Sequence, residues 1–566
     1  MKLAGRSALV TGSSSGIGAA IAVRLAEEGA DIVVHYRGDE DGAKETLKRV
    51  EAAGRRGCIV RADLARLPDI RRLVTKAFDF APLDILVNNA GLEIPSPFID
   101  VTEQDYDKVL DVNLKGVFFA TQGFAKKLIA ARFHGLLSDD MGTLISHQDK
   151  PLYSFFNADR ICDFLLSIGM RPFVELGFMP EMLASGPETV FHYRGNITPP
   201  KDYDAWSTLI RKLLGHWVER YGIAEVRQWF FEVWNEPNLP AFWTGTQEDY
   251  FKLYAHTVQA IKSIDGSLRV GGPATSMTAW VEELRHYCEN NRLPVDFIST
   301  HIYPTDPLGF EGADTEEQLA NSPRDLLRDR AKLVREQARG LPVYFTEWNI
   351  SSNPRDHYHD EPFAAAFAAR IVLETDSFVE SYSYWTFTDI FEENYFPSIP
   401  FHGGFGLLNL HGIPKPIYRA FQLFHHLGHE RLPVVGTHAT VDAWVIRKRG
   451  SVTVFLTNHA QPRHDIVMQR VEIRLTNAPA PLAATIERID EDHANPRRQW
   501  REMSEPEYLS RAQVEELEAA SRVVKEPFDV TYADGTVRFD VDLPPHAIAA
   551  VTLELTPGSP DGGAAT

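Results

Sequence analysis

Two glutamates in similar aromatic surroundings are the residues best suited to do chemistry in this chain. Glu236 lies in FEVWNEP and Glu347 in VYFTEWN, each at the end of a short apolar run typical of a buried strand. Hydrolysis of a glycosidic bond needs two such carboxyl groups across a pocket. One donates a proton to the leaving oxygen, and the other attacks the anomeric carbon. Asn235 is placed to hydrogen-bond a sugar hydroxyl.

Other polar and aromatic side chains stand where further expected strands end. They are His134, Glu175, Asn235, His301, Tyr303 and Trp385. From Arg132 onward, apolar strands alternate with amphipathic helices, which indicates parallel β/α architecture. In a (β/α)8 barrel the C-terminal ends of the strands form the active-site face. We therefore expect these side chains to gather around Glu236 and Glu347.

The region contains seven expected strands, one fewer than a complete (β/α)8 barrel. They span Arg132–Leu137, Arg171–Gly177, Gln228–Pro237, Arg269–Ser276, Asp296–Tyr303, Pro342–Asn349 and Ser381–Asp389. The sequence thus predicts a barrel without its own first strand.

Five motifs carry a resemblance to a known family. RFHGLLSDDM, FEVWNEPNLPAFW, STHIYP, VYFTEWN and YWTFTDIFEE are similar to the retaining glycosidases of glycoside hydrolase family 39, over about residues 131–555. The resemblance implies that Glu236 is the acid/base and Glu347 the nucleophile. It places His134, Asn235, His301 and Tyr303 around the reacting sugar, and Trp385, Glu392 and Glu393 beside it after the last strand.

This family includes β-xylosidases and α-L-iduronidases, and the chain resembles the xylosidase side. The implied activity is exo-hydrolysis of terminal β-D-xylosyl residues from xylo-oligosaccharides by double displacement, with no cofactor or metal required. Iduronate carries a carboxylate, and its binding site would need an Arg or Lys in the pocket. Arg132 is near the right strand, on the opposite side from Phe133, but the sequence does not place it.

The N-terminus has a different pattern. The apolar run Ser7–Thr11 leads into the glycine-rich turn TGSSSGIG, followed by a helical pattern. This order places backbone N–H groups and a helix N-terminus where a pyrophosphate can bind, through Gly12, Gly16 and Gly18. Arg37, at the end of a second strand, is placed to meet a 2′-phosphate.

Together with Asp63 after a third strand and the NNAG turn containing Asn89, these motifs resemble the short-chain dehydrogenase/reductase family up to about Lys127. The resemblance implies NADP binding. Hydride transfer in that family also needs a Tyr-x-x-x-Lys pair, and no tyrosine here has Lys four positions later. Without this pair the proton relay has no agent, so dehydrogenase activity is not expected.

Alternating strands from about Leu432 to Leu555, interrupted by a charged helix near Ser510–Val524, predict a C-terminal β-sandwich. The expected domains are a partial Rossmann segment over 1–128, the barrel over 129–428 and the sandwich over 429–556, with a disordered tail over 557–566. Three functions remain open: an active glycosidase, an accompanying NADP-binding module, and a catalytically impaired fusion.

The junction raises a structural question. The helical pattern over 102–129 belongs to the dehydrogenase-like part but runs directly into a barrel strand. We hypothesise that ILVNNAG and this helix act as a substitute first β/α unit, because a right-handed crossover is the favoured connection. The alternative is an open barrel edge.

Bulk properties narrow the partners. A formal charge of −20 argues against nucleic acid, which needs clustered cations. No run of about 18 apolar residues predicts a membrane span. The three cysteines have no metal spacing and fit a reducing compartment, so a cytoplasmic location is expected. Homo-oligomerisation stays open.

Overall fold

The computed structural model describes residues 3, 6–81, 83, 85–92, 102, 105, 109, 130–148, 150–305, 314–390, 397–428, 430–448 and 450–555. Most of the helix expected over 102–129 and the tail expected over 557–566 lie outside these residues. Glu392 and Glu393 do so as well.

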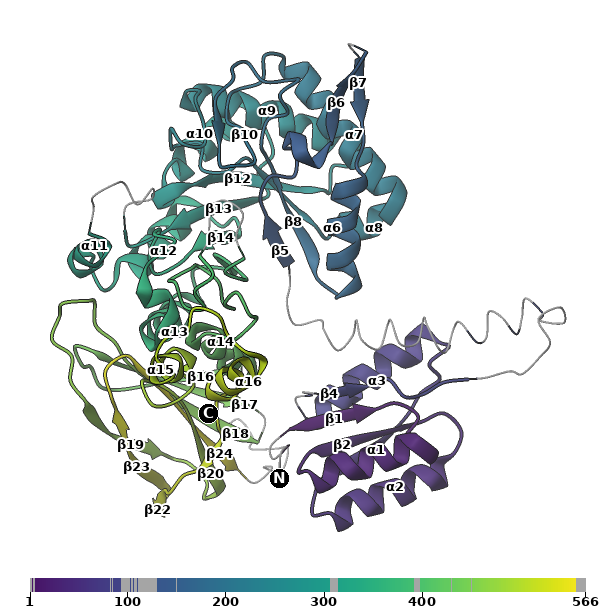
Figure 1. Cartoon of the computed structure of the whole chain (residues 1–566), viewed down its shortest axis with the longest axis vertical. Coiled ribbons are helices and arrows are strands. Elements are labelled where there is room, and N and C mark those ends of the chain that lie inside the picture. Colours follow the sequence, from purple (N-terminus) through teal and green to yellow (C-terminus); the bar gives the residue numbers. More distant parts are fainter. Residues whose placement is uncertain are drawn as a thin grey trace, which may run out of the picture. The chain divides into compact units, whose positions relative to one another are not determined.

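The first four strands form a parallel sheet in the order β3-β2-β1-β4, as in one half of a doubly wound fold. Its elements are β1 Ser7–Val10, α1 Gly16–Glu27, β2 Asp31–Tyr36, α2 Glu40–Ala52, β3 Gly57–Arg61, α3 Leu67–Phe80 and β4 Ile85–Val87. Ala8 and Val10 pack towards α1 and α2, whereas Leu9 packs towards α3. Figure 1 shows the helices on both faces of the sheet. Burial on both faces explains the unbroken apolar run.

The second sheet is the barrel, with seven strands in the order β15-β14-β13-β12-β11-β8-β5. Neighbours from β8 to β15 pair in parallel. The strands are β5 Ala130–Phe133, β8 Arg171–Leu176, β11 Phe230–Val233, β12 Arg269–Thr275, β13 Phe297–Ile302, β14 Val343–Trp348 and β15 Ser381–Tyr384. All seven expected strands are therefore present.

Helices and short segments join these strands. The helices are α6 Phe156–Ser167, α7 Tyr203–Tyr221, α8 Ile223–Val226, α9 Gln247–Ile264, α10 Val281–Asn291, α11 Thr315–Asn321, α12 Leu326–Gln337, α13 Pro362–Thr375 and α14 Pro416–His426. Short 3-10 turns span Asp139–Met141, Ser276–Thr278 and His357–Asp360, and two small hairpins pair β6 Leu144–His147 with β7 Lys150–Tyr153 and β9 Thr189–Val190 with β10 Gly195–Asn196.

The first barrel strand differs from its expected bounds. It ends at Phe133, not Leu137, because Gly135 has a left-handed φ of 74° that turns the chain out of the strand. Leu137 N then donates to Gly177 O at 2.9 Å, beyond the end of β8. The turn leaves His134 immediately after the strand.

The hypothesis that ILVNNAG completes the barrel is wrong for the described residues. The strand β4 pairs with β1, with Ala8 opposite Ile85, and the barrel sheet ends at β5 and β15. Thr11 N donates to Val87 O at 2.9 Å, and the Asn89 side chain bonds to the Thr11 carbonyl at 2.9 Å. These bonds hold β4 in its own sheet.

The C-terminal region consists of two antiparallel sheets that enclose one apolar core. The larger has the order β16-β17-β18-β24-β20-β21 and the smaller β19-β23-β22. The strands are β16 Glu430–Leu432, β17 Val441–Lys448, β18 Ser451–Asn458, β19 Gln469–Thr476, β20 Pro481–Ile489, β21 Glu526–Pro527, β22 Thr531–Ala533, β23 Thr536–Leu543 and β24 Ala547–Leu555. This is the expected β-sandwich.

Two helices, α15 Pro496–Glu502 and α16 Arg511–Ala520, are inserted between β20 and β21. The second is the expected charged helix, and Ser510 with Gln513 forms its capping box. The sandwich packs against α13 of the barrel through Ala365, Phe455 and their neighbours. In the described part of the chain, no helix is both long and apolar enough to cross a membrane.

Candidate active site

The turn after β11 presents the first catalytic candidate. The strand ends at Val233, and Trp234 and Glu236 then adopt left-handed φ values of 70° and 42°. Glu236 N donates to Ala274 O at 2.8 Å, which ties the turn to β12. The Glu236 side chain is buried at the C-terminal end of the barrel strands.

The second catalytic candidate, Glu347, lies on β14 beside a histidine of the neighbouring strand β13. His301 of β13 is the register partner of Glu347. The His301 Nδ1 atom lies 3.1 Å from Glu236 Oε1 and 3.6 Å from Glu347 Oε2. One oxygen of each glutamate and one nitrogen of His301 all lie within 4.8 Å of one another. The Tyr303 hydroxyl donates to Glu347 Oε1 at 2.6 Å.

Arg132 is the residue that the sequence named but did not place. Its side chain, only 1% exposed, donates from Nε to Glu232 Oε2 at 2.6 Å and from Nη2 to Asn235 Oδ1 at 2.8 Å. It also lies 3.2 Å from Glu175 and 3.4 Å from Glu347. A usable signal existed, because alternate residues of a strand share a face. Arg132 is therefore on the same face as His134, which was predicted for the site.

His134 and Trp385 form the side of the site next to β5 and β15. His134 Nδ1 lies 2.8 Å from Glu175 Oε2, and its Nε2 lies 3.6 Å from Glu347 Oε2. The His134 and Trp385 rings meet edge-on at 4.7 Å. Trp385 directly follows β15, whose last residue is Tyr384. The site thus draws together residues from both ends of the barrel sheet.

The pKa values of the two glutamates are shifted in opposite directions. Burial raises the pKa of Glu236 well above its ordinary value, and the charge of Glu347 raises it further. Burial also opposes ionisation of Glu347, but the neighbouring His301, His134 and Arg132 lower its pKa to about 2. The opposite pKa shifts favour Glu236 as the proton donor and Glu347 as the carboxylate.

The surrounding groups contribute to the difference in pKa between Glu236 and Glu347. Burial lowers the pKa of His301 to about 3, so the ring is neutral near pH 7. Burial alone would lower the pKa of Arg132, but the carboxylates of Glu232, Glu175 and Glu347 raise it. Arg132 is thus the permanent cation of the site. Thr346 Oγ1 donates to Glu232 Oε1 at 2.7 Å and holds that carboxylate in place.

Seven of the nine predicted catalytic and substrate-contacting residues thus lie together at one end of the barrel: Glu236, Glu347, His134, Asn235, His301, Tyr303 and Trp385. The other two, Glu392 and Glu393, fall outside the described residues, and their roles stay predictions.

The glycine-rich turn of the N-terminal sheet has the shape of a nucleotide cradle. Gly12 and Gly16 have left-handed φ values of 64° and 57°. A Cβ on Gly18 would lie 2.3 Å from the Gly12 carbonyl oxygen, so only glycine fits there. Arg37 is exposed just past β2. These features fit the close approach of a dinucleotide phosphate.

Three groups near this turn make internal bonds. Gly12 N donates to His35 Nδ1 at 2.9 Å, and Asn89 Nδ2 donates to the Gly12 carbonyl at 3.1 Å. The Asp63 carboxylate accepts from Ala65 N at 3.1 Å. In this structure Asn89 and Asp63 shape the loops, and their predicted cofactor contacts stay predictions.

A family model described as glycosyl hydrolases family 39 matches residues 101–538. The chain belongs to glycosyl hydrolase family 39. A beta-xylosidase of Caldicellulosiruptor saccharolyticus is 50% identical over 429 residues, which cover 75% of this chain and 88% of that protein. The crystal structure of the GH39 enzyme from Xanthomonas axonopodis pv. citri superposes with a TM-score of 0.67 at 35% identity, covering 75% of this chain and 87% of that one. The chain is therefore a glycoside hydrolase.

A second family model, described as short chain dehydrogenase, matches residues 6–137. A hydroxynaphthalene reductase-like protein Arp2 of Metarhizium guizhouense (strain ARSEF 977) is 43% identical over 121 residues, or 21% of this chain and 45% of that protein. The segment before the family 39 barrel is thus similar to part of a short-chain dehydrogenase, and it spans less than half the length of that relative. The two matches overlap across 101–137, which contains the expected junction.

Proposed function

We propose that the chain is a retaining exo-glycosidase that releases terminal β-D-xylosyl residues from xylo-oligosaccharides. The observation that carries the proposal is the pair of buried glutamates with opposite pKa shifts, Glu236 raised and Glu347 lowered to about 2. Glu236 is the acid/base, and Glu347 is the nucleophile. The comparisons support this activity through the beta-xylosidase that is 50% identical.

The carboxyl separation supports retention of configuration. Oxygens of Glu236 and Glu347 lie within 4.8 Å of each other. Retaining glycosidases hold their carboxyl groups about 5–5.5 Å apart, whereas inverting enzymes leave about 6.5–9.5 Å for a water molecule. This spacing supports direct attack by Glu347 on the anomeric carbon and proton donation by Glu236 to the leaving oxygen.

The reaction proceeds by two displacements. Glu347 attacks the anomeric carbon while Glu236 gives its proton to the leaving oxygen, which produces a glycosyl ester on Glu347. Ester formation removes the Glu347 charge, so the pKa of Glu236 falls and its carboxylate becomes a base. Glu236 then deprotonates a water that attacks the ester carbon and frees Glu347. Tyr303 and Arg132 hold Glu347 in place throughout.

Xylose suits the site better than a uronic acid. Recognition of a uronate carboxylate needs a cation. Arg132 is the cation found in the described site, and Glu232, Glu175 and Glu347 already surround it. A neutral sugar avoids competition for this guanidinium. Glu236, His301 and Glu347 also have the composition of a metal site, but a protonated Glu236 is a poor metal ligand.

The test is release of nitrophenol from 4-nitrophenyl β-D-xyloside by the whole chain. Glu347→Ala and Glu236→Ala should both lose this activity. Azide should restore Glu347→Ala and give the α-xylosyl azide, whereas Glu236→Ala with azide should give the β-azide. A folded chain that hydrolyses no xyloside would instead identify a catalytically impaired fusion.

The cradle formed by Gly12, Gly16 and Gly18 favours a second candidate function, namely binding of NADP without hydride transfer. Arg37 is exposed just past β2, and its charge would pair with the 2′-phosphate. Titration of the chain with NADPH, followed by NADPH fluorescence, tests this. Fluorescence that rises linearly without saturation would contradict it.

A further inference from the structure

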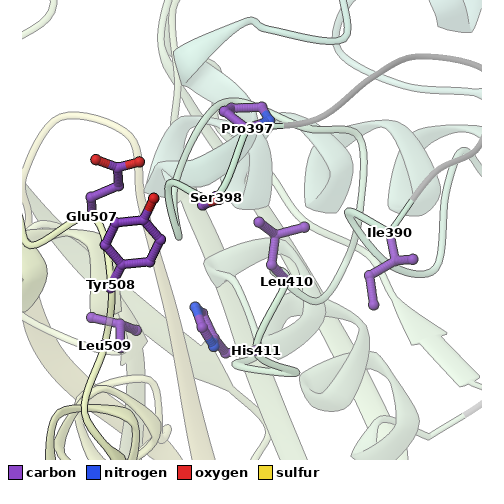
Figure 2. Close-up of a pocket in the computed structure, with 8 residues that line it drawn as sticks. All are labelled: Ile390, Pro397, Ser398, Leu410, His411, Glu507, Tyr508 and Leu509. Carbon is purple, nitrogen blue, oxygen red and sulfur yellow. The ribbon is translucent and has the colours of Figure 1, made fainter.

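A second concave site lies beside the barrel, between the loops after β15 and the segment that joins α15 to α16. It is a pocket of about 380 Å³, within the range of small-molecule sites, which is about 300–1,000 Å³. Ile390, Ser398 and His411 line it from the barrel side, and Glu507, Tyr508 and Leu509 line it from the inserted segment. Figure 2 shows the two walls facing each other across the pocket.

Buried charges anchor the side of the pocket that is formed by the barrel loops. The Lys415 ammonium, fully buried, lies 2.6 Å from Asp360 and 2.8 Å from Asp389, and it donates to Gly404 O at 2.8 Å. Gly406 N donates to Asp389 Oδ1 at 2.8 Å. Because Asp389 immediately precedes Ile390, this cluster fixes the start of the wall.

The opposite wall is held by an apolar cluster and by ion pairs. Trp500 of α15 packs with Phe401 and Ile413 of the barrel loops, and its indole N–H donates to Pro506 O at 3.0 Å. This bond fixes the chain immediately before Glu507. Arg501 lies 2.8 Å from Glu361, next to the start of α13. The residues that precede Ile390 and Glu507 are therefore anchored on both sides of the pocket.

The lining combines an aromatic face with a few polar groups. Tyr508 is 73% exposed and Ile390 is 60% exposed, which is unusual for two large apolar side chains at one pocket. A pyranose has an apolar face of C–H groups and a rim of hydroxyls. The Tyr508 ring suits the face, and Glu507, Ser398 and His411 suit the rim. A carboxylate in the lining disfavours an anionic ligand.

The pocket is within reach of the catalytic site. Ile390 follows Trp385 by five residues, so their Cα atoms are at most about 18 Å apart, because an extended residue spans at most about 3.6 Å. Trp385 contacts His134 of the catalytic site. Loops that follow barrel strands lie on the active-site face. An exo-glycosidase binds one sugar before the scissile bond, so further sugars extend on the leaving-group side.

We propose that this pocket is a subsite for a xylosyl unit on the leaving-group side of the substrate, with Tyr508 as its stacking platform. The proposal rests on the proposed exo-xylosidase function. It makes the helical insertion of the sandwich a determinant of substrate length. Tyr508 acts on binding of the leaving group, not on the reacting carbon.

The test compares two substrates in three variants. Xylotriose can fill the pocket, whereas β-D-xylosyl fluoride has a single atom as its leaving group. In Tyr508→Ala, kcat/KM for xylotriose should fall about tenfold, the equivalent of about 1.4 kcal/mol, with the fluoride unaffected. Tyr508→Phe should retain wild-type values because it keeps the ring. Tyr532→Ala, an exposed tyrosine on β22, is the matched control and should change neither value.

Two results overturn the subsite: unchanged xylotriose kinetics in Tyr508→Ala, or equal losses with both substrates. Failure of the proposed function looks different, because the wild type would then hydrolyse neither substrate. In that event xylotriose binding is measured directly by calorimetry. A loss of affinity in Tyr508→Ala but not in Tyr532→Ala supports the subsite, and equal affinity in all variants rejects it.

Discussion

The N-terminal sheet and the barrel differ in whether the residues needed for the expected chemistry are present. The sheet has the strand order β3-β2-β1-β4 and its glycine turn, but the chain has no Tyr-x-x-x-Lys pair for hydride transfer. The barrel sheet has seven strands, and all of its described site residues follow or lie on those seven. A partial fold thus keeps its chemistry when the strands that carry the reacting groups are among those present.

The two sites also differ in the contacts that stabilise them. The nucleotide cradle depends on local turns, since Gly12, Gly16 and Gly18 are close in sequence. The barrel site depends on contacts between distant residues, such as Arg132 with Glu347 and Tyr303 with Glu347. The cradle can therefore form in a half sheet, whereas the catalytic pair needs the strands in register.

The largest effect should come from the nucleophile. Glu347→Ala should reduce kcat for xyloside hydrolysis by about 10⁴-fold or more, because no other group can form the glycosyl intermediate. Release of nitrophenol and a thermal unfolding curve together check this. A residual kcat within a factor of ten of the wild-type value would contradict the assignment of Glu347 as the nucleophile.

Arg132 offers the next largest effect, on stability as well as on rate. Arg132→Ala leaves Glu175, Glu232 and Glu347 buried without their cation, which should cost about 3–5 kcal/mol in urea unfolding. Arg132→Lys retains the charge and should lose less. If Arg132→Ala unfolds at the wild-type urea concentration, the guanidinium is not the centre of the network.

The electrostatic coupling between Glu236 and Glu347 can be tested directly. The charge of Glu347 contributes to the raised pKa of Glu236. Glu347→Gln removes that charge without changing shape, so the pKa of Glu236 should be lower in the variant. Carbon-13 NMR titration of the glutamate carboxyls measures it. An unchanged pKa would mean that burial alone raises it.

The same pKa values set a pH dependence. Hydrolysis needs a protonated Glu236, so kcat/KM should fall as pH rises through its raised pKa. Glu347 has a folded pKa of about 2, below the unfolded value of about 4.3. Its contribution to stability is therefore complete above about pH 4.3 and is lost as pH falls towards 2. Acid unfolding of the wild type and Glu347→Gln should differ in that window.

The smallest effect concerns the N-terminal sheet. Arg37→Ala should weaken NADPH binding about tenfold, through loss of the 2′-phosphate contact, and should leave hydrolysis unchanged. Lys48→Ala, on the exposed side of α2, is the matched control. Loss of hydrolysis in Arg37→Ala would show that the two regions are coupled.

Many features of this protein could be predicted from short stretches of its sequence. The apolar runs of β1 and β14, the glycine turn and the aromatic motifs around Glu236 and Glu347 each depend on neighbouring residues, so their elements could be predicted. The sequence also predicted seven barrel strands, and the described residues contain seven.

Only the tertiary structure decided the rest. Which partner β4 takes depends on competition between two sheets, and it pairs with β1. The role of Arg132 depends on three carboxylates that lie 43, 100 and 215 positions away in the chain. The opposite pKa shifts of Glu236 and Glu347 arise from burial and charges that exist only when the strands come together. Electrostatic energies depend on distances in space, and no local pattern of residues encodes those distances.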